Sequence, residues 1–213
     1  MEDLPPPPPR TMSREARRTQ LIEATIETLA LRGYARTTLT EVARSANLSH
    51  GLVNFHFETK EKLLAETLSY LAEEYRLNWT EALEAAGSDP AARLNALIEA
   101  DFKPAVCSAS RLAAWCSFWG EAQSRPLYQE RNGANDQHYN ATMQQICVHL
   151  VAVGDYGCDP IRVARIIRAL IEGVWLDLMT MPTPDGVQEA LATVRACAAL
   201  CFPRHFGPQG LLR

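Results

Sequence analysis

Residues 37–62 constrain the fold of this chain more than any other stretch, because two short helical patterns lie there on either side of a polar turn. In the first pattern, Thr38 or Thr40 can cap a helix, and Glu41 follows Thr38 by three residues, as a capping box requires. Asn47 is predicted to end this helix. Its apolar residues recur at the spacing of one buried helix face: Leu39, Val42, Ala43 and Ala46.

The second pattern begins after Ser49, whose hydroxyl can cap another short helix. Leu52, Val53 and Phe57 are predicted to face inward. The residues left as candidates to face outward are polar or small: His50, Gly51, Asn54 and His56. Two short helices joined by a tight turn form the layout of a DNA-binding helix-turn-helix. The same pattern also fits an ordinary helical hairpin in an all-α core.

Charge is unevenly distributed along the 213 residues, whose formal net charge is -4. Residues 10–60 hold eight Arg or Lys against five acids, whereas the residues from 63 onward hold twelve against seventeen. A basic head on an acidic body is typical of a protein whose head binds DNA. With 47% apolar and 22% charged residues, the composition is that of a soluble globular protein.

Neither a membrane span nor a secretion signal is predicted. No apolar run approaches the roughly 18 residues that a membrane helix needs. The N-terminus also lacks the apolar centre of a signal peptide, so we expect a cytoplasmic protein with no membrane partner.

The reactive side chains do not form a recognisable catalytic or metal site. The six cysteines show no CxxC pair, and we expect them to be reduced and buried. Cys197, Cys201 and His205 recur every four residues, but no fourth metal ligand is evident. A nucleophile elbow and a phosphate-binding loop are also missing, so neither an enzyme nor a cofactor is predicted.

The fold class is predicted to be all-α, with about nine helices and no convincing strand. Ser13 can cap a first helix that runs to about Arg32 and ends at Gly33. After the two short helices, six longer ones are expected at 60–86, 90–103, 107–121, 127–153, 159–180 and 185–202. These patterns divide the chain into four parts. A disordered Pro-rich tail at 1–12, where Met12 could be the natural start, precedes a three-helix head at 13–58. A ligand-binding and dimerisation body at 59–204 and a tail at 205–213 complete the chain.

The helices at 159–180 and 185–202 are apolar around most of their circumference, and Arg162, Arg165 and Arg168 give the first of them one basic edge. Such helices are buried on two sides. A homodimer through a four-helix interface is therefore predicted. Two symmetric heads would also fit the two half-sites of a palindromic operator.

Aromatic residues gather in the predicted body. Trp115, Phe118 and Trp119 lie one helical turn apart. Further rings and nearby acids occur on other elements: Phe102, Tyr128 and Trp175, with Asp101, Glu121, Glu172 and Asp177. These rings can simply form the core. If they line a cavity instead, rings with a carboxylate suit a quaternary ammonium ligand, because ring faces attract cations.

The stretch from Thr37 to Leu64 resembles the TetR family of transcriptional regulators. It begins Thr-Thr-Leu-Thr-Glu-Val-Ala, continues through Leu-Ser-His-Gly-Leu-Val and ends Phe-Glu-Thr-Lys-Glu-Lys-Leu-Leu. The resemblance implies a DNA-binding head on a helical ligand-binding and dimerisation domain. It also implies that the residues at the family's DNA-facing positions are Thr38, Thr40, Ser49, His50, Gly51, Val53, Asn54, His56 and Lys60. The chain departs from many members at Asn54 and Phe55, where they have Tyr.

Residues 114–119, 126–128 and 170–176 are similar to the BetI subgroup, the choline-responsive repressors of glycine-betaine synthesis. This resemblance implies a repressor released by choline or a similar quaternary amine. The ligand-binding candidates are Phe102, Trp115, Phe118, Trp119, Tyr128, Glu172 and Trp175. Three alternatives remain open: the same regulator with an unrelated apolar or nitrogenous effector, an enzyme, and a helical adaptor.

Overall fold

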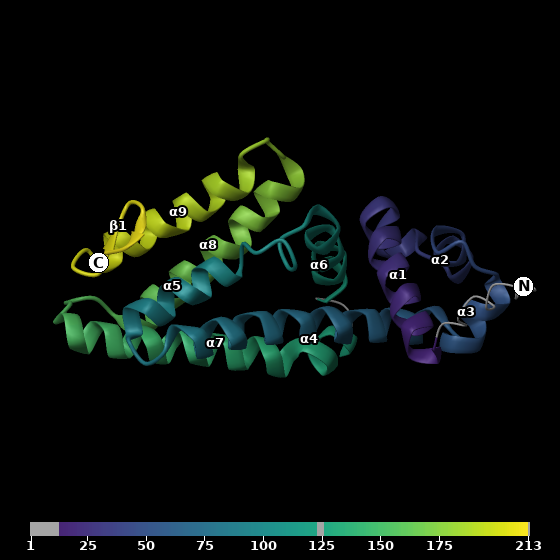
Figure 1. Ribbon diagram of the computed structural model, residues 1–213, viewed down its shortest axis with the longest axis horizontal. Helices are drawn as coiled ribbons and strands as arrows, with labels where there is room; N and C mark the ends of the chain where they lie inside the picture. Colours follow the sequence, from purple (N-terminus) through teal and green to yellow (C-terminus); the bar gives the residue numbers. More distant parts are fainter. Residues whose placement is uncertain (1–12, 123–125, 213) are drawn as a thin grey trace, which may run out of the picture.

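The computed structural model describes residues 13–122 and 126–212, so the predicted tail at 1–12 lies outside the described residues. Within these ranges the chain forms nine helices and one small hairpin (Figure 1). The helices are α1 (Arg14–Arg36), α2 (Leu39–Ser45), α3 (His50–Phe57), α4 (Lys60–Ala86), α5 (Pro90–Ala100), α6 (Ala109–Ala122), α7 (Pro126–Gly154), α8 (Pro160–Thr180) and α9 (Gly186–Cys201), and the strands are β1 (Phe206–Gly207) and β2 (Gly210–Leu211). The all-α prediction is confirmed.

Side-chain caps begin the helices of the head where the sequence indicated. The hydroxyls of Ser13, Thr38 and Ser49 accept hydrogen bonds from the backbone N–H groups of Ala16, Glu41 and Leu52, at 3.1, 3.2 and 3.3 Å. Each bond satisfies one of the N–H groups that a helix start leaves unpaired. The α2 cap is therefore Thr38 rather than Thr40.

The first helix ends later than the sequence predicted. Gly33 adopts φ 73° and ψ 171°, which breaks the helical geometry, but one further turn follows and α1 extends to Arg36. A positive φ carries no steric penalty for glycine, so the chain can kink there and continue. The kink brings Tyr34 and Ala35 close to the start of α4.

The molecule is elongated, with the head at one end and the hairpin at the other (Figure 1). The head consists of α1, α2 and α3 around buried apolar side chains that include Leu21, Val42, Val53 and Phe57. Helix α4 runs from the head along the body and packs against α5 and α7. Helix α6 packs against α1, which joins the body to the head.

The C-terminal residues contain the strands that the sequence did not predict. Phe206 pairs with Leu211 and Gly207 with Gly210 in an antiparallel hairpin that contacts α9 and α5. Phe206 is 2% exposed, so its ring anchors the hairpin to the body. Two-residue strands carry no alternation pattern, which is why periodicity could not reveal them.

In the two described ranges, no helix combines the length and the apolar character that crossing a membrane requires. The same ranges contain no group of three or more His, Cys, Asp or Glu side chains arranged to hold a metal ion.

Candidate DNA interface and effector site

One surface of the head carries polar or small residues on α2 and α3 and at their N-caps. Thr38, Thr40, Ser49, His50, Gly51 and Asn54 are all exposed. A Cβ added at Gly51 would meet no atom within 4 Å, so this part of α3 faces open space. Hydroxyl, imidazole and amide groups can hydrogen-bond base edges, and an Asn can bind adenine through two bonds.

Two of the nine predicted DNA-facing residues are buried instead. Val53 has no exposed surface and His56 is 9% exposed, so the expectation that His56 faces outward is wrong. Burial lowers the pKa of His56, and the positive charges of Arg14, Arg18 and Arg17 lower it further. Phe55 takes the outward position and is 66% exposed. The α-helical period places residue 56 nearly above residue 53, which is why both turn inward.

Three arginines at the start of α1 lie beside α3 and make the rim of the head positive. Arg14 lies over the exposed Phe55 ring, 5.6 Å from its centroid. Arg18 is held more firmly, because it donates to the His56 carbonyl at 3.0 Å and pairs with Glu66 on α4. Cations at a helix start oppose the helix dipole, so their placement favours a nearby anion such as a DNA phosphate.

Lys60 has structural contacts that its predicted phosphate role did not include. Its Nζ donates to the carbonyls of Tyr34 and Ala35 at 2.9 and 3.0 Å, and it lies 5.4 Å from the Tyr34 ring centroid. An ammonium group has three donors. Lys60 therefore ties the start of α4 to the end of α1 and keeps one N–H for another partner.

In the body, five aromatic side chains form a continuous cluster, which we call the aromatic cluster: Tyr75, Trp115, Trp119, Tyr139 and Trp175. The Trp119 ring is stacked between Trp115 and Trp175, with centroids 6.4 and 6.3 Å away. Tyr75 contacts Trp115, Trp175 and Tyr139 at 6.3, 6.0 and 5.6 Å. Four helices, α4, α6, α7 and α8, contribute to it.

A buried carboxylate and a guanidinium complete this cluster. Asp101 has no exposed surface and accepts hydrogen bonds from the hydroxyls of Tyr75 at 2.7 Å and Tyr139 at 2.6 Å. Arg168 donates to the Tyr75 hydroxyl at 2.8 Å and lies 4.6 Å from the Tyr139 ring centroid. Burial raises the pKa of the Asp101 carboxyl, and the charge of Arg168 opposes that shift.

The predicted ligand-binding residues separate into those near the aromatic cluster and those elsewhere. Trp115, Trp119 and Trp175 belong to it, and Trp119 also donates to the Tyr128 hydroxyl at 3.0 Å. Glu172 joins through an ion pair with Arg168 at 2.8 Å. Phe118 instead meets Tyr34 on α1, at 6.0 Å, and Phe102 is buried in the core.

Sequence reasoning did not select Tyr75, Tyr139 or Arg168 as ligand-site residues. The sequence pattern places Arg168 on one basic edge with Arg162 and Arg165, but the Arg168 side chain is 13% exposed. Arg162 and Arg165 do face solvent. The spacing of three residues was the available signal, because each such step turns the side chain by about 60° around an α-helix, so Arg168 lies about 120° from Arg162 and faces the core side.

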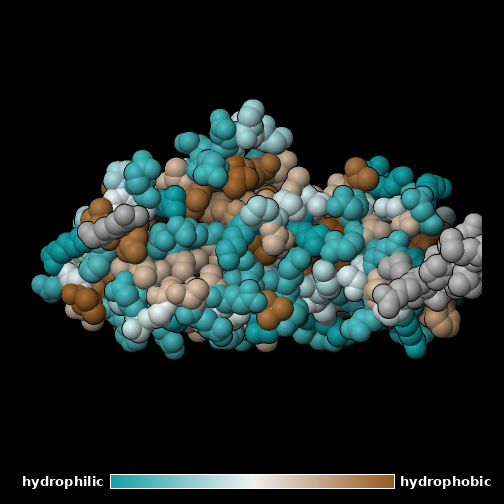
Figure 2. Space-filling view, in the orientation of Figure 1, coloured by the Kyte–Doolittle hydropathy of each residue, from teal (hydrophilic) through white to brown (hydrophobic). Residues whose placement is uncertain are grey.

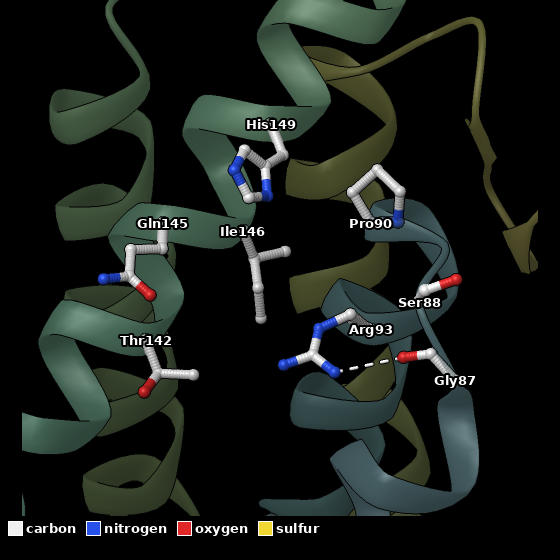
Figure 3. A pocket seen from close by; sticks show the side chains of 8 residues that line it. All are labelled: Gly87, Ser88, Pro90, Arg93, Thr142, Gln145, Ile146 and His149. Carbon is white, nitrogen blue, oxygen red and sulfur yellow. Dashed lines mark hydrogen bonds between the residues drawn. The ribbon is translucent and has the colours of Figure 1, made fainter.

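Two cavities in the body have no ring of the aromatic cluster in their lining. A cavity of about 510 Å³ between α7 and α8 is lined by Arg168 and Glu172, among others. A second, of about 310 Å³, lies between α7 and the α4–α5 turn (Figure 3). There Arg93 donates to the carbonyl of Gly87 at 3.0 Å, and His149 and Gln145 of α7 belong to the lining. No predicted ligand residue lines the second cavity.

One ion-pair network connects the aromatic helix α6 with the head. Arg111 on α6 contacts Glu23 on α1 at 2.7 Å and Glu74 on α4 at 3.0 Å. Tyr70 also donates to Glu23, at 3.0 Å, and burial together with that contact raises the pKa of Tyr70 to about 12. The network fixes α6 against both helices that enter the head.

A helix-turn-helix head with an exposed polar face, joined to an all-α body, is the layout of a DNA-binding regulator. Family models agree over both parts: one described as bacterial regulatory proteins, tetR family, matches residues 21–67, and one described as BetI-type transcriptional repressor, C-terminal, matches residues 90–203. The chain belongs to the TetR family of transcriptional regulators and has a BetI-type repressor C-terminal domain.

Individual proteins support this assignment. The HTH-type transcriptional regulator BetI of Paraburkholderia phymatum is 32% identical over 183 residues, which cover 86% of this chain and 91% of that protein. A putative transcriptional regulator from Pseudomonas aeruginosa PAO1 shares the fold with a TM-score of 0.75 and 24% identity, over 92% of this chain and 96% of that one. A putative regulator from Saccharomonospora viridis, solved in complex with choline, has a TM-score of 0.73 and 19% identity, over 86% and 95%.

Proposed function

We propose that this regulator is a homodimeric repressor that binds a palindromic operator in the cytoplasm and is released by a small cationic effector, choline or a similar quaternary amine. The observation that carries the proposal is the aromatic cluster with the buried carboxylate of Asp101 in a chain whose head has an exposed polar face. Ring faces and a carboxylate attract a cation that has no N–H to donate.

The proposed operator contacts divide into base-reading and phosphate-binding groups. His50, Gly51 and Asn54 project from α3 and would read base edges in the major groove. Thr38, Thr40, Ser49 and the remaining N–H of Lys60 would contact phosphates. Val53 and His56 would act from inside, by fixing the position of α3 in the head.

The proposed dimer interface lies on α8 and α9. Apolar or small residues on α8 are exposed at Ile166, Ala169, Gly173 and Leu176, which are spaced three and four residues apart on one face. Leu200 on α9 is 84% exposed. Brown residues gather over these helices in the space-filling view (Figure 2). Exposed apolar stripes on adjacent helices favour a symmetric contact with a second copy.

The effector class is supported by the chemistry of the aromatic cluster, and choline is the ligand of one structural neighbour. An unrelated apolar or nitrogenous effector is the second candidate. It is favoured by the parallel rings of Trp119 and Trp175, whose planes differ by 10° at a centroid distance of 6.3 Å, because uncharged ring faces also suit an apolar ligand.

The test uses a fluorescently labelled palindrome from the promoter of the protein's own gene, with affinity measured by anisotropy. We expect binding whose logarithm falls linearly with the logarithm of salt concentration, as phosphate contacts release counterions. Asn54→Ala should weaken binding by about tenfold, because one bidentate base contact contributes about 1–3 kcal/mol. Gln145→Ala, which removes an exposed amide from α7, is the matched control and should bind like the wild type.

The effector arm adds choline chloride to the preformed complex, with sodium chloride at equal ionic strength as the control. Release by choline alone supports the quaternary amine. Release by salt and choline equally, with DNA binding otherwise intact, would reject that effector and leave the unrelated effector. Equal affinity of Asn54→Ala and wild type would reject the proposed reading by α3.

A further inference from the structure

Arg168 occupies the place where a cation would bind in the aromatic cluster. Its guanidinium carbon lies 4.6 Å from the Tyr139 ring centroid and 5.9 Å from that of Tyr75. Both distances fall within the roughly 6 Å over which a ring face attracts a cation. The same guanidinium donates to the Tyr75 hydroxyl, which in turn donates to Asp101. The protein therefore supplies its own cation to these rings and this acid.

The ring faces leave no place for a second cation beside it. Tyr139 has no exposed surface and Tyr75 is 5% exposed. Tyr75 packs against Trp115 and Trp175, so its surface away from Arg168 is also covered. A cationic ligand that uses these faces must take the place of the guanidinium.

Acidic side chains surround the Arg168 guanidinium on several sides. Glu172 contacts its Nε at 2.8 Å, Asp136 lies 4.0 Å from its Nη2, and Asp101 is reached through Tyr75. Arg165 also lines the adjacent cavity, but it is exposed to solvent. Three carboxylates facing one buried guanidinium favour a cation in this place whether it comes from the protein or from a ligand.

The structure also provides a place for the displaced side chain. The cavity of about 510 Å³ between α7 and α8 has Arg168 and Glu172 in its lining, together with polar groups of Asn140 and Gln144. Glu172 is on the solvent side of the guanidinium, with its side chain 45% exposed. Rotation about the Arg168 side-chain bonds can keep the Glu172 pair while the guanidinium leaves the tyrosine rings.

We propose that Arg168 is a tethered competitor, whose guanidinium holds the cation place of the aromatic cluster until a quaternary ammonium effector displaces it toward the α7–α8 cavity. This inference rests on the proposed function, because it assumes an effector of that class. It adds a residue that sets the affinity and the charge selectivity of the site. The observed effector affinity is the intrinsic affinity multiplied by the fraction of molecules in which Arg168 has left the rings.

The test measures tryptophan fluorescence of the full-length protein during titration with tetramethylammonium chloride and with choline chloride. Arg168→Met keeps the apolar length of the side chain and removes the competing charge. We expect it to bind both cations about tenfold more tightly than the wild type, as removal of a resident competitor restores the intrinsic affinity. Arg165→Met, on the same helix and in the same cavity wall, should change the affinity less than about twofold, since Arg165 does not contact the rings.

A ligand control separates charge from shape. In the uncharged carbon isostere of choline, a tert-butyl group replaces trimethylammonium. This isostere should bind both the wild type and Arg168→Met more weakly than choline does. If the isostere binds Arg168→Met as tightly as choline does, the vacated space is only an apolar pocket and the competitor role is overturned.

The outcomes distinguish this inference from the proposed function. Binding of choline to the wild type with equal or weaker binding to Arg168→Met overturns the competitor role and leaves the quaternary amine effector intact. No binding of either cation to either protein, while both still bind operator DNA, rejects the effector class and the competitor role together.

A measurement on the wild type covers the case in which Arg168→Met does not fold. In an NMR titration, the Arg168 Nε–H signal should start at a position shifted by the Tyr139 ring and move toward the position of a solvent-facing arginine as tetramethylammonium binds. Comparison with an Arg168→Lys spectrum assigns the signal. A signal that stays in place at saturation overturns the displacement.

Discussion

The head and the body of this regulator place their polar side chains in opposite environments. In the head, Thr40, His50 and Asn54 face solvent from α2 and α3. In the body, Asp101 is fully buried, and two tyrosine hydroxyls and a guanidinium surround it. The head groups stay hydrated until a partner arrives, whereas the body groups have lost their water and depend on one another.

This difference matches the two proposed roles, DNA recognition by the head and effector response by the body. An exposed group can be exchanged with little effect on the fold, so the DNA surface can vary while the head remains stable. A buried network has few alternative arrangements, because each member left unpaired costs free energy. A ligand that takes one member's place therefore changes several contacts at once, which suits the body to control the head.

The largest expected effect on stability comes from Asp101. Asp101→Leu leaves the Tyr75 and Tyr139 hydroxyls without their acceptor and the Arg168 charge less compensated. We expect the free energy of unfolding to fall by about 3–5 kcal/mol, as for other buried pairs that lose one partner. Urea denaturation followed by circular dichroism measures it. Asp101→Asn keeps the shape of the side chain and removes only its charge, so its free energy of unfolding should fall less. A loss under about 0.5 kcal/mol for Asp101→Leu would contradict the contrast between body and head.

An intermediate effect is expected at the junction of the two regions. Arg111→Ala leaves Glu23 and Glu74 without their shared guanidinium, and we expect a loss of about 1–2 kcal/mol from these partly exposed charged hydrogen bonds. The same variant should weaken the coupling between effector and DNA affinity, measured by operator anisotropy with and without choline. Arg76→Ala, which removes a surface pair with Glu73 on α4 alone, is the control and should leave the coupling unchanged.

The smallest effect on stability is expected at Lys60. Lys60→Ala removes two hydrogen bonds to the end of α1, and we expect about 0.5–1.5 kcal/mol of destabilisation. If its third N–H contacts a phosphate, the variant should also release about one counterion fewer on binding the operator. The slope of log affinity against log salt concentration should then decrease by about 1, without a change in sequence preference. Lys62→Ala is the control, because that lysine forms a surface pair with the exposed Glu58. An unchanged salt slope for Lys60→Ala would restrict Lys60 to its structural contacts.

Much of the fold could be predicted from the sequence because its signals are local. Caps such as Thr38 and Ser49 and the spacing of apolar residues each act within one or two helical turns. The hairpin of β1 and β2 was not predicted because its two-residue strands are too short to show periodicity and its position depends on contacts with α9 and α5.

The candidate site was less predictable, since its members come from distant parts of the chain. Trp115 and Trp119 could be selected as neighbours on one helix, whereas Tyr75 and Tyr139 meet only because α4 and α7 pack side by side. The inward turn of His56 and the separation of Phe118 from the aromatic cluster also depend on which helix face meets a neighbour.

By itself, the sequence determined the helical class, the places where the helices of the head begin, and the family, because each of these is written in short-range spacing and motifs. Only the tertiary structure decided that Lys60 is tied to α1, that His56 is buried, and that the guanidinium of Arg168 lies on the tyrosine rings beside Asp101. Those outcomes depend on the packing of helices that are tens of residues apart, and no local pattern specifies which side chains such packing brings together.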